Sequence, residues 1–439
     1  MQRIMRPPCT KEQRSMLEQI LDRWNIDKAL EQVIRNKGAG GVDGMQTDEL
    51  REYLNANWQS LRKQILEGNY KPSPVKKVEI PKPQGGKRML GIPTVVDRLL
   101  QQAINQWMMP KYEEQFSRHS YGFRPNKNAH QAVMQAQIYL NEGREWVVEL
   151  DLEKFFDKVN HDRLMSVLSR TIKDKPTLKF IRGYLTSGIL EDGVVSQRIE
   201  GTPQGSPLSP LLSNIVLDEL DKELEKRGHA YVRYADDCSI YVRSEAAAKR
   251  VAESIIEYIE GELLLKVNRT KTKISCPDES TLLGFTFFRQ KDGWEIRIAG
   301  KAVGRIREKC KDITGRSNGL SENEKLTKLQ PIIRGWVNYY VIAQAKSVMQ
   351  SLDELVRTRL RICQWKIWKK PYTRVRNLLK LGVSKNNAIK WGTSSKGYCR
   401  IAHSPILLTT MTKKYFGKRG YHGFYNMYHL RTGVQKSLF

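Results

Sequence analysis

The pattern of hydrophobic and polar positions changes near Gly300. Before this point, segments with helical spacing alternate with short runs rich in Val, Ile and Tyr, which predicts an α+β fold. Here we predict helices at residues 27–35, 47–66, 97–115, 211–227 and 245–262, and strands at 75–80, 146–151, 231–234, 238–242, 266–275 and 281–298. After it, basic helices are predicted at residues 301–310, 322–333 and 349–368, whereas the last 50 residues give no clear prediction.

Two further helix predictions rest on local signals. The apolar residues between Leu17 and Trp24 follow helical spacing, so a helix is expected near the N-terminus. A Pro- and Gly-rich loop precedes the helix that begins near Leu211, and Ser206 or Ser209 is expected to cap this helix.

Two adjacent carboxylates lie in the turn of a predicted β-hairpin. The runs on either side of Ala235 have the composition of strands, and Asp236 and Asp237 follow in the turn. Asp151 ends another apolar strand. If that strand neighbours the hairpin in one sheet, the three carboxylates converge, and protonation or bound cations would relieve their repulsion. The alternative is a solvated Asp-Asp turn in an ordinary surface hairpin.

Three such carboxylates suit phosphoryl transfer with two divalent metal ions. Two ions bridged by acids stabilise both the attacking and the leaving oxygen of an in-line displacement. Magnesium is the expected ion, because the ligands are hard oxygens and no His or Cys stands at ligand spacing.

The net charge of +28 is concentrated beyond residue 300. Residues 301–439 hold 29 Lys and Arg against 6 Asp and Glu, whereas the first 300 residues hold 46 against 41. The basic part is interleaved with Trp336, Tyr339, Tyr340, Trp365, Trp368, Tyr372, Trp391 and Tyr398. This combination suits a polyanion with stackable bases, so a nucleic acid is the expected partner. The alternatives are a solvated basic surface and contact with an anionic membrane.

Composition also sets the expected environment. No apolar run is long enough to span a bilayer, and no signal-like segment follows Met1. The six cysteines lie far apart without a Cys-x-x-Cys pair, so we expect reduced thiols rather than a zinc or redox site. We therefore expect a soluble, intracellular protein.

Ordered sequence blocks around these acids resemble one known family. The blocks are Gly41-Val42-Asp43-Gly44, Ile80-Pro81-Lys82-Pro83 with Lys87-Arg88, Tyr121-Gly122-Phe123-Arg124-Pro125, Asp151 to Asp157, Pro203-Gln204-Gly205, Tyr234-Ala235-Asp236-Asp237, Asn268 to Thr272, Leu283-Gly284-Phe285 and Arg334 to Tyr340. In this order they are similar to the reverse transcriptases encoded by bacterial group II introns. The firm blocks cover residues 27–340. No His-Asn-His nuclease module follows, so second-strand cleavage is not expected.

The resemblance implies an α+β right-hand polymerase made of fingers, palm and thumb. Its implied regions are an N-terminal extension and fingers at residues 1–90, a fingers and palm core at 91–300, a helical maturase thumb at 301–385, and a small basic, DNA-binding region at 386–439. It implies a metal-dependent enzyme with two Mg²⁺ ions, which Mn²⁺ can replace. The implied metal ligands are Asp151, Leu152, Asp236 and Asp237, and the three aspartates are the implied catalytic residues.

The implied nucleotide-binding residues have structural alternatives. The set is Lys82, Arg88, Phe155, Phe156, Gln204 and Lys271. Phe156 would lie against the deoxyribose and exclude a 2′-hydroxyl, whereas Phe155 is expected to be a core residue. Lys82 and Arg88 would hold the triphosphate, unless they belong to a solvated basic loop. For Lys271, Lys273 is the competing candidate on the same strand face.

The implied primer and template contacts lie mostly in the thumb. They are Gly284, Phe285, Arg334, Trp336, Arg361 and Lys366. Gly284 would let the backbone approach the primer end, and the alternative is a plain strand with a buried Phe285. A packed helix that buries Trp336 is compatible with the thumb interpretation.

The leading hypothesis is an RNA-directed DNA polymerase that also binds its group II intron RNA as a splicing maturase and supports retrohoming. Its expected partners are an RNA template, the intron RNA, a DNA primer or target and dNTPs, without a membrane, in the bacterial cytoplasm near the nucleoid. Three rivals remain: a non-enzymatic splicing factor, a domesticated repair, defence or CRISPR-linked reverse transcriptase, and an RNA-dependent RNA polymerase. The three acids disfavour the first rival, and Phe156 disfavours the last.

Overall fold

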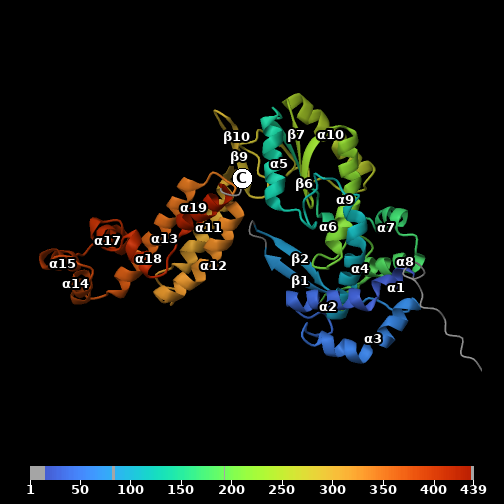
Figure 1. The fold of residues 1–439 in the computed structure, drawn as a ribbon, viewed down its shortest axis with the longest axis horizontal. Helices are drawn as coiled ribbons and strands as arrows, with labels where there is room; N and C mark the ends of the chain where they lie inside the picture. Colours follow the sequence, from blue (N-terminus) through green and yellow to red (C-terminus); the bar gives the residue numbers. More distant parts are fainter. Residues whose placement is uncertain (1–14, 82–84, 192, 437–439) are drawn as a thin grey trace, which may run out of the picture. The chain divides into compact units, whose positions relative to one another are not determined.

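The computed structural model describes residues 15–81, 85–191 and 193–436, and it divides the chain into two units (Figure 1). The units are Met1–Cys276 and Pro277–Phe439. The division lies before the boundary that we expected near Gly300, because the hairpin at residues 285–298 forms its own two-stranded sheet rather than joining the sheets of the first unit.

Three helices open the first unit: α1 (Met16–Ile20), α2 (Arg23–Asn36) and α3 (Leu50–Leu66). Ser15 caps α1 in a capping box with Glu18, and the Asp22 side chain accepts from the Trp24 amide at the start of α2. This break separates Leu17, which is buried, from Trp24, which is 71% exposed. The single helical pattern that we predicted is therefore two helices.

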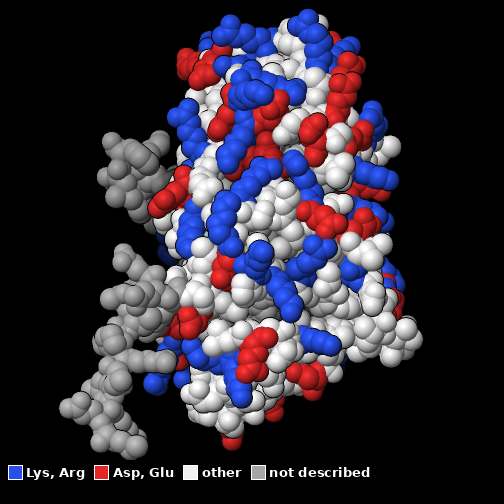
Figure 2. All heavy atoms as spheres, turned by 90° about the vertical axis from the view of Figure 1, so that its right-hand side faces the viewer, with Lys and Arg blue, Asp and Glu red and all other residues white. Residues whose placement is uncertain are grey.

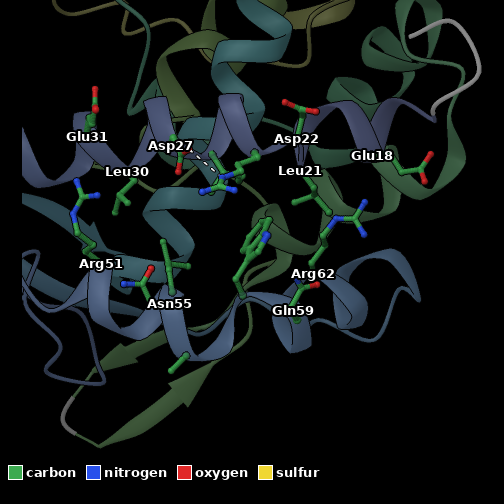
Figure 3. Close-up of a pocket in the computed structure, with 15 residues that line it drawn as sticks. Glu18, Leu21, Asp22, Asp27, Leu30, Glu31, Arg51, Asn55, Gln59 and Arg62 are labelled. Atoms are coloured by element: carbon green, nitrogen blue, oxygen red, sulfur yellow. Dashed lines mark ion pairs between the residues drawn. The ribbon is translucent and has the colours of Figure 1, made fainter. Parts of the chain in front are cut away.

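A polar groove of 910 Å³ lies between α1–α2 and α3 (Figure 3). Acidic side chains of α1, α2 and their junction face Arg51 and Arg62 of α3 across it, and Leu21 and Leu30 contribute apolar surface. Arg23 also pairs with Asp27 at 3.8 Å, but both side chains are exposed and the pair contributes little.

The first sheet has the strand order β2-β1-β4-β5. Its strands are β1 (Val75–Pro81), β2 (Lys87–Ile92), β4 (Ile189–Glu191) and β5 (Val194–Ser196). β1 and β2 form an antiparallel hairpin in which Ile80 pairs with Arg88. The basic residues Lys87 and Arg88 therefore lie at the start of β2 in this hairpin.

The second sheet has the order β6-β7-β3-β8 and carries the predicted acids. Its strands are β3 (Trp146–Leu150), β6 (Ala230–Tyr234), β7 (Asp237–Val242) and β8 (Lys273–Ser275). Leu150 pairs with Cys238 in an antiparallel ladder. Asp151 and Asp237 are the next residues of the two strands, so they lie opposite each other. The predicted strand 266–275 is mostly wrong, because only its last three residues pair in the ladder.

The other helices of the first unit are α4 (Val95–Glu113), α5 (Ala129–Asn141), α6 (Phe155–Lys158), α7 (His161–Thr171), α8 (Lys175–Thr186), α9 (Ser209–Lys226) and α10 (Glu245–Gly261). α5, α9 and α10 pack against the second sheet, where Val148 and Ile240 are fully buried. The predicted serine cap of α9 is wrong. Leu208 is the N-cap, and the Ser209 hydroxyl instead donates to the Pro203 carbonyl at 2.8 Å.

Basic side chains of the first unit are largely balanced by acids. Arg163 and Arg170 both pair with Glu219, at 2.7 and 2.8 Å. Figure 2 shows one face of the molecule on which Lys and Arg are interspersed with Asp and Glu. Such a surface differs from the strongly basic composition beyond residue 300.

The second unit begins with the hairpin of β9 (Phe285–Gln290) and β10 (Gly293–Ile298) and is otherwise helical. Its helices are α11 (Gly300–Ile313), α12 (Glu322–Tyr340), α13 (Lys346–Ile367), α14 (Pro371–Lys380), α15 (Lys385–Gly392), α16 (Tyr398–Ala402), α17 (Pro405–Thr410), α18 (Lys413–Lys418) and α19 (Phe424–Lys436). The segment without a sequence prediction is thus helical. Its helices α16 to α18 have only five or six residues, too few to give a periodic signal.

Asp353 of α13 holds the start of α19. Its carboxylate accepts from the Tyr421 hydroxyl at 2.7 Å and from the amides of Phe424 and Tyr425 at 2.7 and 3.0 Å. Gly423 has a φ of +71°, and a Cβ there would overlap the carboxylate. The acid therefore acts as a helix cap supplied from another helix.

Two expectations from composition can be compared with the described residues. Within them, no helix combines the length and the apolar character needed to cross a bilayer. Cys238, Cys310, Cys363 and Cys399 are free thiols, as predicted, and Cys9 lies outside the described residues.

Asp353→Ala should lower the free energy of unfolding of the second unit by about 3 kcal/mol, because three donors lose a buried acceptor. Urea denaturation followed by circular dichroism measures this change, and limited proteolysis should cut first near α19. Asp312→Ala, on the exposed side of α11, is the matched control and should change little. Equal unfolding midpoints for both variants would contradict the role of Asp353.

Candidate active site

The β6–β7 turn presents the two adjacent carboxylates. Tyr234 pairs with Asp237, so Ala235 and Asp236 form the two-residue connection between the strands. Ala235 adopts a φ of +58°, a left-handed conformation that costs a non-glycine residue about 1 kcal/mol. The predicted hairpin, with the acids at its end, is confirmed.

A buried arginine holds this turn in place. Arg233 has no exposed surface, and its guanidinium donates to the Ala235 carbonyl at 2.8 Å. It also donates to Asp221 at 2.7 Å and to Asn214 at 3.1 Å, both on α9. A further bond of 2.8 Å reaches the Ser120 hydroxyl. The guanidinium therefore joins the β6–β7 turn to a helix and to a loop.

The segment around Ser120 is also bonded to the edge of β6. The amide of Tyr121 donates to the Arg233 carbonyl at 2.9 Å, and the amide of Arg233 donates to the His119 carbonyl at 3.0 Å. A Cβ on Gly122 would overlap the backbone nitrogen of Ala235. Only glycine allows this approach, which fixes the loop directly against the turn.

One cavity of 1130 Å³ in the first unit brings the predicted acids together. Asp151, from the end of β3, lines it with Asp236 and Asp237. The predicted nucleotide residues that share this lining are Arg88, Phe155, Phe156, Gln204 and Lys271. Residues from a hairpin, a strand end, a short helix and two loops thus meet at one place.

The carboxylates carry negative charge that the protein only partly compensates. Burial, with the charges of Asp236 and Asp151, raises the pKa of Asp237 to about 6, although its side chain remains open to the cavity. Burial is also the main cause of a raised pKa at Asp236, with a smaller contribution from Asp151. Arg88 opposes this second shift. A bound cation would relieve both.

The donor set fits a divalent metal in its chemistry. All three acids offer hard oxygens, and the raised pKa values of Asp236 and Asp237 show unneutralised charge. Among the described residues, however, no three His, Cys, Asp or Glu side chains are gathered closely enough to form a complete metal site. Asp151 instead pairs with the Lys271 ammonium at 3.6 Å. The acids line one cavity as separate groups.

The chain matches two families over successive parts of its sequence. Residues 80–287 match the reverse transcriptase (RNA-dependent DNA polymerase) family, and residues 303–382 match the group II intron, maturase-specific domain. Protein YkfC of Escherichia coli (strain K12) is 33% identical over 307 residues, 60% of this chain and 81% of YkfC. The group II intron-encoded protein LtrA of Lactococcus lactis subsp. cremoris is 35% identical over 195 residues, 44% of this chain and 32% of LtrA. This chain belongs to the group II intron-encoded reverse transcriptases.

Membership of this family establishes the class of reaction. The protein is an RNA-directed DNA polymerase that depends on a divalent metal, and it carries a maturase domain. Its substrates are RNA and DNA. The family resemblance that the motifs indicated is confirmed, and the α+β polymerase fold agrees with it.

The two adjacent phenylalanines of this reverse transcriptase occupy different environments, as predicted. Phe155 is 2% exposed and belongs to the core, whereas Phe156 is half-buried. Their rings pack edge to face, 5.5 Å apart. The core ring therefore supports the ring that is open to the cavity.

The structure separates the two candidate lysines. Lys271 lies in the turn before β8 and lines the cavity, so the expectation that it shares a strand face with its rival is wrong. Lys273 lies within β8, where it pairs with Glu149 in the ladder and does not line the cavity. Gln204 is anchored by its carbonyl, which accepts from the Gly91 amide at 2.8 Å. Lys82 lies outside the described residues.

Gly284 and Phe285 are tightly packed within the second unit. Gly284 has a φ of +83°, and a Cβ there would meet the Tyr340 hydroxyl. Phe285 is fully buried, with its ring 5.4 Å from that of Tyr339 and 4.9 Å from that of Tyr340. These contacts account for both residues by packing, and primer contact stays a prediction.

Two predicted thumb contacts have other partners. Arg361 is 5% exposed and donates to the Met411 carbonyl at 3.0 and 3.2 Å, so its role as a nucleic-acid contact is corrected to a structural one. Lys366 donates to the Arg316 carbonyl and the Ser317 hydroxyl, each at 3.0 Å. In contrast, Arg334 is exposed, and the half-buried Trp336 lines a groove of the second unit.

The sequence predictions missed several residues that line the cavity. Asn268 is one of them, and its amide donates to the Asp151 carbonyl at 2.8 Å. Arg98 and Phe123 are others. Asn268 and Phe123 each belong to a sequence block that carried the resemblance, so their blocks were the available signal.

Divalent-cation affinity should depend on pH through Asp237, whose pKa of about 6 exceeds its ordinary value of 3.8. Below pH 6 a proton competes with the cation, so the affinity should fall by up to about tenfold per pH unit. Mn²⁺ binding measured between pH 5 and 8 tests this prediction, and equal Mn²⁺ affinity at pH 5 and 8 would contradict the assignment.

The raised pKa of Asp237 should also lower the free energy of unfolding of the metal-free protein as pH rises from 3.8 to about 6.

Proposed function

We propose that this chain extends a DNA primer along an RNA template with dNTPs, using two Mg²⁺ ions that Mn²⁺ can replace. Asp151, Asp236 and Asp237 are the catalytic residues. The observation that carries the proposal is the meeting of these carboxylates, from β3 and the β6–β7 hairpin, in one cavity that basic side chains also line.

Four residues would hold the metal ions. They are the three aspartates and Leu152, whose backbone carbonyl is its available ligand. When bound, such ions neutralise charge on the attacking and leaving oxygens of an in-line phosphoryl displacement. The raised pKa values of Asp236 and Asp237 support this assignment, because a cation would take the place of the bound protons.

Basic residues at the rim of the cavity would bind the triphosphate. Arg88 is exposed at the start of β2, and Lys271 is exposed near Asp151. Lys82 belongs to the same proposed set. Phosphoryl transfer depends mainly on positioning and charge neutralisation, which these side chains supply, while Gln204 would line the pocket of the base.

Phe156 would select deoxyribonucleotides. Its half-buried ring opens to the cavity only five positions after Asp151, and Phe155 supports it from the core. A bulky ring beside the sugar leaves no room for a 2′-hydroxyl and offers it no hydrogen-bond partner. This arrangement suits synthesis of DNA rather than RNA.

We also propose that the second unit binds group II intron RNA for splicing and retrohoming, and grips the template and primer. A groove of 610 Å³ between α11 and α12 is lined by Arg305, Lys309, Trp336 and Tyr339. Cations beside aromatic rings suit phosphates and stacked bases. Gly284, Phe285 and Arg334 would contribute to this grip. Binding to a DNA target would bring the protein to the nucleoid.

Primer extension on an RNA template with annealed DNA primer, dNTPs and Mg²⁺ tests the proposed activity. Asp236→Asn should lower kcat by about a thousandfold or more, because loss of metal-mediated charge stabilisation removes several kcal/mol. Asp162→Asn is the matched control. Asp162 is an exposed residue of α7 whose side chain forms an ion pair with Arg182 of α8. Wild-type protein without extension, or Asp236→Asn with full extension, would overturn the proposal.

Phe156→Val should relax discrimination against ribonucleotides by about 10- to 100-fold, the range expected for a change in pocket shape. The ratio of kcat/KM for a dNTP and the matching rNTP measures this effect. Phe180→Val is the control, because Phe180 is a buried core ring that does not line the cavity, so its loss should weaken the core without changing the ratio. Unchanged discrimination by Phe156→Val would show that another residue excludes the 2′-hydroxyl.

A further inference from the structure

Phe123 is an exposed aromatic residue in an uncommon backbone conformation. It is 49% exposed and has a φ of +57°, the left-handed region that bulky residues rarely occupy. Its neighbours Tyr121, Gly122 and Arg124 are all buried. The loop thus turns one large apolar side chain outwards at a position where glycine or asparagine would be easier to accommodate.

The residue before Phe123 is fixed against the catalytic turn. Gly122 lies so close to Ala235 that a Cβ would overlap its backbone nitrogen. The Gly122 carbonyl accepts from the Asn214 amide at 2.9 Å, and Asn214 also contacts the Arg233 guanidinium. The backbone at Gly122 is therefore held in a fixed position relative to Asp236.

The residue after Phe123 is fixed on the opposite side. Arg124 is 8% exposed and forms a two-bond pair with Glu113, at 3.0 and 2.8 Å. Its guanidinium also donates to the Ser120 carbonyl at 2.8 Å. Buried bidentate bonds of this kind hold a backbone firmly, so the strained conformation between them is maintained by the fold.

The ring of Phe123 lines the same cavity as the three carboxylates. In the free protein the exposed ring contributes no burial energy to folding. The loop is nevertheless held rigidly in the conformation that exposes the ring. Such a ring offers a flat apolar face at low conformational cost to whatever enters the cavity. Apart from Gln204, the lining groups with proposed roles contact phosphate, sugar and metal, and the part of a nucleotide that needs an apolar face is its base.

We propose that Phe123 is a substrate-contacting residue whose ring packs against a nucleobase beside Asp236. This inference rests on the proposed polymerase function and deepens it by naming the contact. The base belongs either to the incoming dNTP or to the end of the primer–template duplex. Both bases present the same apolar face, and separate measurements of the primer–template Kd and the KM for dNTP distinguish them.

The test uses Phe123→Gly in the full-length protein. Glycine removes the ring and accepts the positive φ, so the melting temperature should stay equal or rise. The Kd for a primer–template, measured by fluorescence anisotropy, or the KM for dNTP should increase about tenfold, as expected for loss of one stacked base. Phe123→Trp keeps an aromatic face and should retain values near those of the wild type.

Leu264→Gly is the matched control. Leu264 has a φ of +55° and is 53% exposed, but it does not line the cavity. It should gain the same conformational relief and leave both affinities unchanged.

The outcomes separate this inference from the proposed function. A higher primer–template Kd places the ring on the duplex end, and a higher KM for dNTP places it on the incoming base. If Phe123→Gly leaves both affinities unchanged, or lowers only kcat, the inference is overturned while wild-type extension still supports the polymerase. If the wild type extends no primer, the proposed function fails, and an unchanged primer–template Kd then rejects the ring contact as well.

Discussion

The buried guanidinium of Arg233 is the interaction on which the β6–β7 turn and the cavity beside it depend. A charge with no exposed surface is tolerated only when it is paired and its donors are satisfied, and Asp221, Asn214, Ser120 and the Ala235 carbonyl meet that need. Removal of the Asp221 carboxylate would leave an uncompensated charge in the interior. The fold therefore has little freedom to move the turn away from α9 or from the loop at residue 120.

The same constraint keeps Asp236 and Asp237 at the cavity that Asp151 also lines. Carboxylates that repel each other would move apart on a flexible loop, but the paired strands fix Asp151 and Asp237 at the same end of β3 and β7. The resulting electrostatic cost is visible in the raised pKa values of Asp236 and Asp237. Most of the surplus positive charge of the chain belongs to residues beyond 300. The part of the sequence that forms the cavity therefore lacks this surplus, which would otherwise neutralise the acids.

Local sequence patterns predicted the parts of the site that depend on local forces. The alternating apolar residues around Ala235 and the apolar run before Asp151 predict strands without information from distant parts of the chain. The positions of the acids are then predicted too, because the acids stand at the ends of these strands. Predictions failed where distant partners decide. Arg361 has the sequence context of an exposed basic helix residue, but it is buried and its guanidinium donates to the Met411 carbonyl, 50 residues further along the chain. The short C-terminal helices gave no periodic signal, because their stability comes from packing on α13 and its neighbours.

The cap that Asp353 provides for α19 has a consequence for the order of events during synthesis. Its partners Tyr421, Phe424 and Tyr425 are 68 to 72 residues further along the chain. At cellular rates of elongation the ribosome needs on the order of 4 to 14 s to add them. During that interval the carboxylate must stay hydrated, so α13 cannot settle into its final packing. The second unit is therefore completed only after α19 has been synthesised.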